Sequence, residues 1–99
     1  MCSEKTGIRK QVLEEIIDLA KFYDLSRVIL FGSRARGDYL KKSDIDLAVE
    51  GKNIVDFALD VDEKTDTLLQ YDIVDMSKAD EELLKNIRKD GITLYEKIR

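Results

Sequence analysis

The first patterned segment of the chain has the spacing of an amphipathic helix. Between residues 8 and 23 apolar side chains recur at helical intervals, with acidic and basic side chains between them. These apolar positions are Ile8, Val12, Ile16, Leu19, Ala20 and Tyr23. The unbroken apolar run 28–31 then ends at Gly32, which is typical of a strand covered on both faces. The pattern predicts a helix followed by a central strand.

From residue 44 the pattern becomes an alternation of polar and apolar positions. Ile45, Leu47 and Val49 would share one face of a second strand. The acids Asp44 and Asp46 would share the other face. A second helix is expected to follow, with apolar positions at Ile54, Phe57, Ala58, Val61 and Leu68.

The remaining part of the chain predicts a strand, a helix and a short end segment. Residues 71–76 have the composition of a third strand. Ser77 precedes Asp80 by three residues, a spacing like that of a capping box, and acidic residues continue into the first turn of the helix expected there. Gly91 is expected to end this helix, and residues 92–95 to form a short strand or turn.

Length and composition fit one small domain. The chain has 99 residues, of which 43% are apolar, and no apolar run approaches the roughly 20 residues of a membrane span. The order of elements predicts an α+β fold (an α/β sandwich), with a small mixed β-sheet packed with helices, as a single domain over residues 1–99. No basic-then-apolar signal region opens the chain. We therefore expect a soluble, cytoplasmic protein with no membrane partner.

Charge and missing residue types limit the possible chemistry. Histidine is absent and the single cysteine is Cys2, which excludes an internal disulfide, a thiolate metal site and a histidine-dependent triad. Carboxylates remain as the ligands for a hard cation such as Mg²⁺. The 21 acidic residues outnumber the 17 basic ones, giving a net charge of −4, which argues against a broad nucleic-acid-binding surface.

The turn after the predicted central strand has the composition of a phosphate site. Gly32 has no Cβ, so backbone amides there can approach an anion, and Ser33 adds a hydroxyl donor at the start of a helical turn. Arg34 and Arg36 would supply guanidinium groups for phosphate oxygens or for the departing pyrophosphate. The glycine–serine pair alone is more often an ordinary turn beside solvated arginines.

Two acids open the second predicted strand. Asp44 and Asp46 are two residues apart, so both carboxylates project from one face of the strand, about 7 Å apart at the backbone. Such a pair is often only the wet face of a strand, but aspartate is depleted in strands and adjacent like charges repel unless a cation compensates. Asp72 or Asp75 of the third strand would supply a third carboxylate, and their spacing lets at most one face the site.

Together these segments resemble a known signature. Phe31-Gly32-Ser33, ten intervening residues and Asp44-Ile45-Asp46 resemble the motif of the DNA polymerase β-like nucleotidyltransferase superfamily, in its minimal form, the MNT domain. The resemblance covers nearly the whole chain, including Asp-Ile-Val-Asp at 72–75 and Gly-Ile-Thr-Leu-Tyr-Glu at 91–96. It implies the nucleotidyltransferase fold.

The resemblance also implies roles for individual residues. In this superfamily the glycine–serine pair binds the triphosphate, which places that role on Gly32 and Ser33. The paired aspartates bind two divalent metal ions, which implies Mg²⁺ ligands at Asp44 and Asp46. A third aspartate completes the catalytic site and helps to activate the acceptor hydroxyl; since it opens the third strand in the family, Asp72 is preferred.

Minimal domains of this kind resemble the antitoxins of HEPN/MNT toxin–antitoxin pairs. That resemblance implies transfer of AMP from ATP to a tyrosine of a small helical HEPN toxin, which blocks the ribonuclease activity of the toxin. Larger relatives carry additional acceptor-binding domains, and this chain ends at Arg99. We therefore expect the acceptor to be bound by a partner chain.

Other functions compete with this one. A non-catalytic antitoxin that masks its toxin would need no metal, and a nucleotidyltransferase acting on a small molecule or an RNA end would need no toxin. Loss of Asp44 and Asp46 would separate masking from transfer. A purely structural α+β domain would have to treat the motif spacing, the arginines and the third-strand acid as unrelated coincidences.

Overall fold

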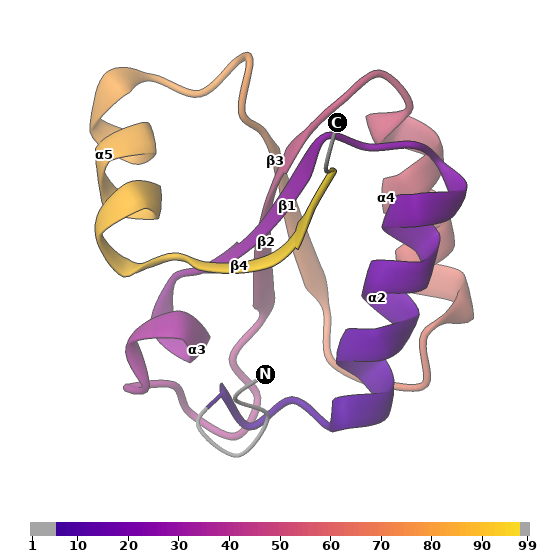
Figure 1. Ribbon diagram of the computed structural model, residues 1–99. Helices are drawn as coiled ribbons and strands as arrows, with labels where there is room; N and C mark the ends of the chain where they lie inside the picture. Colours follow the sequence, from indigo (N-terminus) through magenta and orange to yellow (C-terminus); the bar gives the residue numbers. More distant parts are fainter. Residues whose placement is uncertain (1–5, 98–99) are drawn as a thin grey trace.

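A single four-stranded sheet organises the protein. The computed structural model describes residues 6–97, so Cys2 lies outside the described residues. The elements are α2 (Lys10–Phe22), β1 (Arg27–Phe31), α3 (Ser33–Arg36), β2 (Ile45–Glu50), α4 (Ile54–Lys64), β3 (Tyr71–Asp75), α5 (Glu81–Asp90) and β4 (Ile92–Glu96). Figure 1 shows the strands crossing the middle of the molecule with helices on both sides. Among residues 6–97, no helix has the length and apolar character required to span a membrane.

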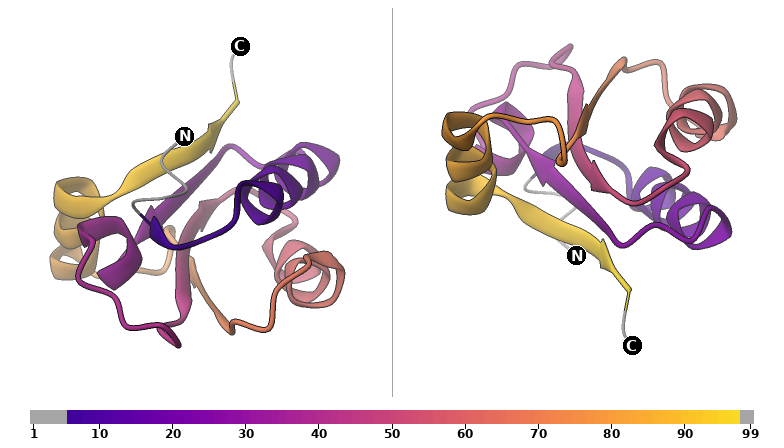
Figure 2. Two further views of the ribbon diagram at one scale, coloured as in Figure 1. Left: turned by 90° about the horizontal axis from the view of Figure 1, so that it is seen from below. Right: turned by 90° about the horizontal axis from the view of Figure 1, so that it is seen from above.

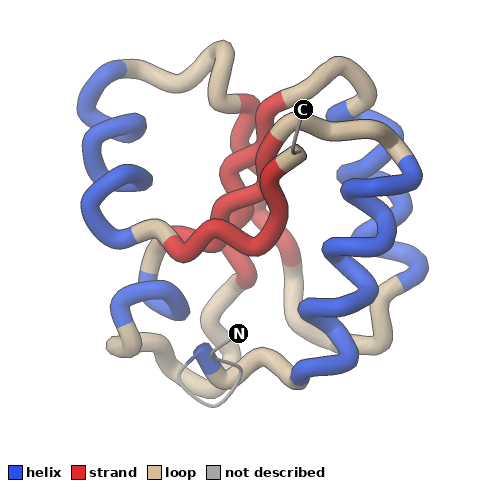
Figure 3. The backbone as a smooth tube through the Cα atoms, in the orientation of Figure 1, coloured by secondary structure: helices blue, strands red, loops and turns tan. Residues whose placement is uncertain are grey.

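The sheet is mixed, as expected. Its strand order is β3-β2-β1-β4, so β1 is a central strand. Figure 3 shows the strands, in red, between the helices. Strand β1 runs antiparallel to both β2 and β4, whereas β2 and β3 are parallel. The parallel pair is joined by α4, because parallel neighbours need a crossover connection. The predicted α+β class with a small mixed sheet is confirmed.

One face of the sheet is largely covered by helices. We call it the filled face; it carries Val28, Leu30, Ile45, Leu47 and Val49, all of which are 0% exposed. Helices α2 and α4 lie over it (Figure 2), and their buried residues join the same core cluster. The apolar face predicted for the second strand, Ile45, Leu47 and Val49, therefore lies in the core.

The opposite face is only partly covered. We call it the open face; it carries Ile29, Phe31, Asp46, Ala48 and Asp72, which alternate with the residues of the filled face along β1, β2 and β3. Helix α5 lies on this side (Figure 2), where Ile87 packs against Ile29 and Ala48 in a second, smaller cluster. Asp46 and Asp72 lie on the same face but are not part of that cluster.

Two local expectations need correction. Leu68 does not belong to the second helix, because α4 ends at Lys64 and Leu68 lies fully exposed in the following loop. The residue that caps α5 is Asp80, whose carboxylate accepts a hydrogen bond of 2.8 Å from the amide of Leu83, so Ser77 does not play the part of the cap. The end of α5 at Gly91 is confirmed: its amide bonds to the carbonyl of Ile87.

Candidate active site

The turn after β1 requires a glycine for two reasons. Gly32 has a φ of 75°, a conformation that side chains with a Cβ rarely adopt. A Cβ at this position would also lie 2.2 Å from Oδ2 of Asp46, so only glycine lets the turn and this carboxylate approach each other. Ser33 follows as the first residue of the short helix α3. The predicted phosphate turn is therefore in direct contact with one of the predicted metal-binding acids.

The sheet brings three predicted acids to the same region. Asp46 on β2 is the register partner of Asp72 on β3, and on its other side it is paired with Phe31, the residue that precedes Gly32. Asp44 lies one residue before β2 and is exposed, on the same side as Asp46 by alternation. The open face thus carries Asp44, Asp46 and Asp72 next to the glycine turn.

Asp75 is directed elsewhere. It is in register with Val49, a residue of the filled face, so it lies on the side of the sheet opposite to Asp72. Its carboxylate accepts hydrogen bonds from the amide and the hydroxyl of Ser77, at 2.9 and 2.7 Å. Of the two candidates for the third acid, Asp72 lies beside Asp46, whereas the carboxylate of Asp75 is hydrogen-bonded within a turn.

The electrostatics of Asp46 report crowding of negative charge. Burial raises the pKa of its carboxyl group above the ordinary value, and the neighbouring charges of Asp72 and Asp44 raise that pKa further. Arg36 acts in the opposite direction and lowers the pKa of Asp46. A half-buried carboxylate that is repelled by two others favours either a proton or a bound cation.

The two arginines of the turn occupy different environments. The side chain of Arg36 is 45% exposed and forms an ion pair of 3.3 Å with Asp38, so it can reach a ligand beside the acids. Arg34 is only 1% exposed, and its guanidinium group donates hydrogen bonds to three backbone carbonyls. Contrary to expectation, Arg34 does not present its charge to the open face.

The donor set suits a hard divalent cation. The three acids offer only carboxylate oxygens, which Mg²⁺ prefers to nitrogen or sulfur. Within residues 6–97 no three carboxylates converge closely enough to enclose an ion by themselves. Magnesium commonly takes one or two protein carboxylates and completes its shell with water and substrate phosphates, so the arrangement fits such a shared site.

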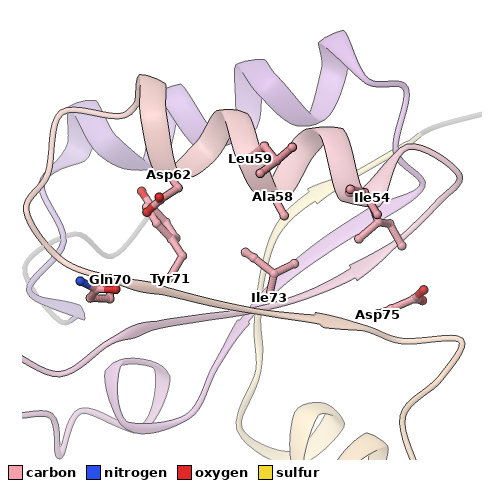
Figure 4. A pocket seen from close by; sticks show the side chains of 9 residues that line it. Ile54, Ala58, Leu59, Asp62, Gln70, Tyr71, Ile73 and Asp75 are labelled. Carbon is pink, nitrogen blue, oxygen red and sulfur yellow. The ribbon is translucent and has the colours of Figure 1, made fainter.

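An apolar groove lies on the other side of β3. Figure 4 shows Tyr71 and Ile73 directed toward α4, where Ile54, Ala58 and Leu59 form the opposite wall. These strand residues alternate with Asp72, so the groove and the acids are on opposite sides of the sheet. The groove is therefore separate from the acid site.

Sequence reasoning missed the residues that fix the loop between Gly37 and Asp44. The guanidinium group of Arg34 lies over the ring of Tyr39, with its central carbon 4.7 Å from the centroid of that ring. The carbonyl of Gln70 accepts a hydrogen bond of 2.8 Å from the amide of Ile45, which ties the start of β2 to the residue before β3. Backbone carbonyls leave no mark in a sequence, and only the aromatic residue in a polar loop offered a signal.

The fold and this site together define the class of the protein. The mixed sheet places the glycine–serine turn against Asp46, one of the paired aspartates of the motif that the sequence shares with nucleotidyltransferases. Residues 14–99 match the family model described as "Polymerase beta, Nucleotidyltransferase", and the chain belongs to this family.

Similar proteins agree with this assignment. The chain is 37% identical over 81 residues to a protein of Methanocaldococcus jannaschii named "Putative protein adenylyltransferase MJ0604", covering 72% of this chain and 79% of that protein. A crystal structure of a toxin–antitoxin with AMP-PNP is 25% identical, with a TM-score of 0.71 over 86% of this chain and 73% of the other. A crystal structure from Sulfolobus solfataricus described as a "putative nucleotidyltransferase" is 28% identical, with a TM-score of 0.56 over 98% and 89% of the two chains.

Proposed function

We propose that this protein transfers AMP from ATP to a hydroxyl group of a partner protein, and that it acts in this way as the antitoxin of a HEPN-type toxin. The name of the Methanocaldococcus relative supports protein adenylylation. The toxin–antitoxin structure with AMP-PNP supports an adenine nucleotide and a toxin partner. A tyrosine of the toxin is the acceptor that we propose, in keeping with the MNT resemblance of the sequence.

The turn residues would hold the triphosphate. Backbone amides at Gly32 and Ser33 would bind phosphate oxygens at the start of α3, where the glycine allows a close approach of the backbone. Arg36 is exposed beside Asp46 and would contact the oxygens of the departing pyrophosphate. Arg34 is assigned no direct contact with the nucleotide, because the residue is 1% exposed and each of its guanidinium nitrogens already donates a hydrogen bond within the protein.

The acids would hold the metal and assist the attack. Asp44 and Asp46, with Asp72, would bind two Mg²⁺ ions in the substrate complex. When bound, the ions would neutralise phosphate charge and stabilise both the attacking and the leaving oxygens. The acceptor oxygen forms a bond to the α-phosphorus, the bond from that phosphorus to the bridging oxygen of the β-phosphate breaks, and pyrophosphate leaves. Asp72 would accept the proton of the acceptor hydroxyl.

The observation that carries this proposal is the pairing of Asp46 with Asp72. The two residues are register partners on parallel strands, and Asp46 is also within contact distance of the Gly32 turn. Repulsion among carboxylates that meet on one face destabilises a fold unless a cation is bound. A purely structural domain would gain nothing from this placement.

The matched acids of β3 provide the test. The protein, its Asp72→Asn variant and its Asp75→Asn variant would each be incubated with Mg²⁺, a co-encoded partner protein, and ATP labelled at the α-phosphate. We expect covalent label on the partner with the native protein and with Asp75→Asn, and none with Asp72→Asn, because only Asp72 shares a face with Asp46. ATP labelled at the γ-phosphate should leave no label, and mass spectrometry should locate AMP on a tyrosine.

One outcome would reject this function, and another would reject the assignment of the third acid. If the partner is inhibited without acquiring label, the protein acts by masking. If Asp75→Asn abolishes transfer while Asp72→Asn does not, the assignment of the third acid fails.

A further inference from the structure

We propose that Arg34 is a positioning residue: its buried guanidinium group fixes the loop 38–43 against the glycine turn and thereby sets where Asp44 stands. This inference rests on the proposed function only in taking Asp44 as a metal ligand. The positioning itself is carried by contacts among the described residues.

The guanidinium group of Arg34 binds three separate parts of the chain. Nε donates to the carbonyl of Ser43 at 3.0 Å, Nη1 to that of Thr6 at 2.9 Å, and Nη2 to that of Lys41 at 3.2 Å. The residue is 1% exposed, so these carbonyls replace water around the charge. A buried guanidinium group in which every nitrogen donates a hydrogen bond holds its partners in fixed positions, because each lost bond would leave a buried polar group unsatisfied.

Tyr39 closes this cluster from one side. Its ring lies 4.7 Å from the central carbon of the guanidinium group, in a cation–π arrangement. The same ring packs against Gly7, where an added Cβ would lie 2.6 Å from a ring carbon. The loop, the segment at residues 6–7 and the turn residue Arg34 therefore form one packed unit.

The contacts lead directly to Asp44. The Ser43 carbonyl belongs to the peptide group that joins Ser43 to Asp44. A tight turn precedes it, in which the Ser43 hydroxyl accepts a hydrogen bond from the amide of Leu40. On the far side of Asp44, the amide of Ile45 donates to the carbonyl of Gln70. Both peptide groups that flank the exposed acid are thus anchored, one of them by Arg34.

The other end of the link is the phosphate turn itself. Arg34 immediately follows Ser33 in α3, and the backbone of α3 is closed by the bond from the Gly37 amide to the Ser33 carbonyl. The side chain of Arg34, which follows Ser33, therefore binds the carbonyl of Ser43, which precedes Asp44. Lysine would not replace it, because an ammonium group lacks the planar fork that reaches several carbonyls and stacks on a ring.

The test compares variants of Arg34 with a destabilising variant elsewhere in the core. Arg34→Met and Arg34→Lys remove the fork, whereas Val61→Ala makes a cavity in α4 under the filled face. The readouts are the affinity for Mn²⁺ in the presence of AMP-PNP, which needs no catalysis, and hydrogen exchange of the amides in residues 40–45. Tyr39→Leu is a milder variant of the same unit if Arg34→Met fails to fold.

We expect Arg34→Met to weaken Mn²⁺ binding about tenfold, the lower end of the effect of losing a partner that orients a metal ligand. Exchange in residues 40–45 should accelerate in the same variant. Arg34→Lys should recover little of either, and Tyr39→Leu should move both in the same direction by less. Val61→Ala should lower the melting temperature while leaving Mn²⁺ affinity and loop exchange unchanged.

The inference is overturned if Arg34→Met and Tyr39→Leu bind Mn²⁺ as tightly as the native protein with the loop still protected, or if Val61→Ala weakens binding equally. Failure of the proposed function has a different signature. A native protein that binds Mn²⁺ and AMP-PNP in an Arg34-dependent way, yet labels no partner, rejects transfer and leaves the positioning role intact. If the native protein binds no Mn²⁺, the metal site is rejected, and loop exchange in the Arg34 variants alone decides whether this residue fixes the loop.

Discussion

The filled face and the open face of the sheet are built from neighbouring residues of the same strands, yet they differ in what they contribute to the protein. On the filled face, Leu47 and its neighbours are removed from water by α2 and α4. On the open face, α5 covers Ile29 and Ala48 but not Asp46. The pKa of Asp46 is raised by burial and by the charges of the neighbouring acids. The filled face supplies stability, and the open face retains a repulsive charge cluster that a bound cation or a proton would relieve. Substitutions should therefore separate stability from activity by face.

The largest effect is expected from the acids of the open face. Replacing Asp44 and Asp46 together by asparagine should reduce nucleotidyl transfer by at least about 10³-fold, because several kcal/mol of transition-state stabilisation depend on the metal. The fold should survive, since neither carboxylate contributes to the apolar core. Initial rates of labelled AMP transfer and a thermal melt would check this. A variant that transfers AMP at the native rate would remove the acids from the mechanism.

A comparable free energy should be lost on the filled face without a specific loss of function. Phe57 of α4 is fully buried, and Phe57→Ala should lower the free energy of unfolding by roughly 3–5 kcal/mol through lost burial and a cavity. Urea unfolding measures this change. Below the melting temperature the variant should still bind Mn²⁺ and nucleotide with native affinity. Weakened binding by the folded fraction would show that the two faces are not independent.

A smaller effect concerns stability against pH. Because the pKa of Asp46 is raised in the folded protein, the folded state holds the proton more tightly than the unfolded chain does. The contribution of this group to stability is therefore greatest below the unfolded pKa and is lost as the pH rises through the folded pKa. In metal-free buffer, Asp46→Asn should raise the melting temperature at pH 7, and the gain should disappear toward pH 3. A gain that is equal at both pH values would point to a cause other than ionisation.

The smallest effect is expected outside both faces. Leu68 is fully exposed in the loop between α4 and β3, so Leu68→Ser should change the free energy of unfolding by less than about 0.5 kcal/mol and leave transfer unaltered. The same urea and labelling assays apply. A loss of more than 1 kcal/mol, by the scale of ordinary surface substitutions, would mean that this leucine packs as the helix residue that its spacing suggested.

Patterns that repeat along the chain were predictable, and contacts between distant segments were less so. The alternation at Ile45, Leu47 and Val49 revealed both the strand and its buried side, because strand geometry places every second residue on one face. Leu68 misled, since an apolar residue at helical spacing does not show where a helix stops. The spacing of Ser77 and Asp80 indicated a helix start but did not show that Asp80 itself is the cap, which depends on the position of the Leu83 amide.

In the candidate site, too, the residues could be predicted from local patterns, whereas their orientation depended on contacts between distant segments. The spacing of Asp72 and Asp75 lets at most one of them face the site, and the family resemblance favoured Asp72. The register of β3 against β2 places Asp72 beside Asp46. Arg34 and Arg36 look equivalent in sequence, two residues apart in a basic turn. Their separation into a buried and an exposed arginine comes from carbonyls of the loop and of Thr6, and these depend on the tertiary fold.

The central claim is that the acids of the open face bind a divalent metal together with a nucleotide. The most direct measurement is the broadening of backbone amide NMR signals by Mn²⁺ in the presence of AMP-PNP. We predict broadening centred on residues 32–37, 44–46 and 72, and none on α4, although its exposed surface is also acidic. Broadening centred on α4, or spread evenly over all acidic surfaces, would contradict the account.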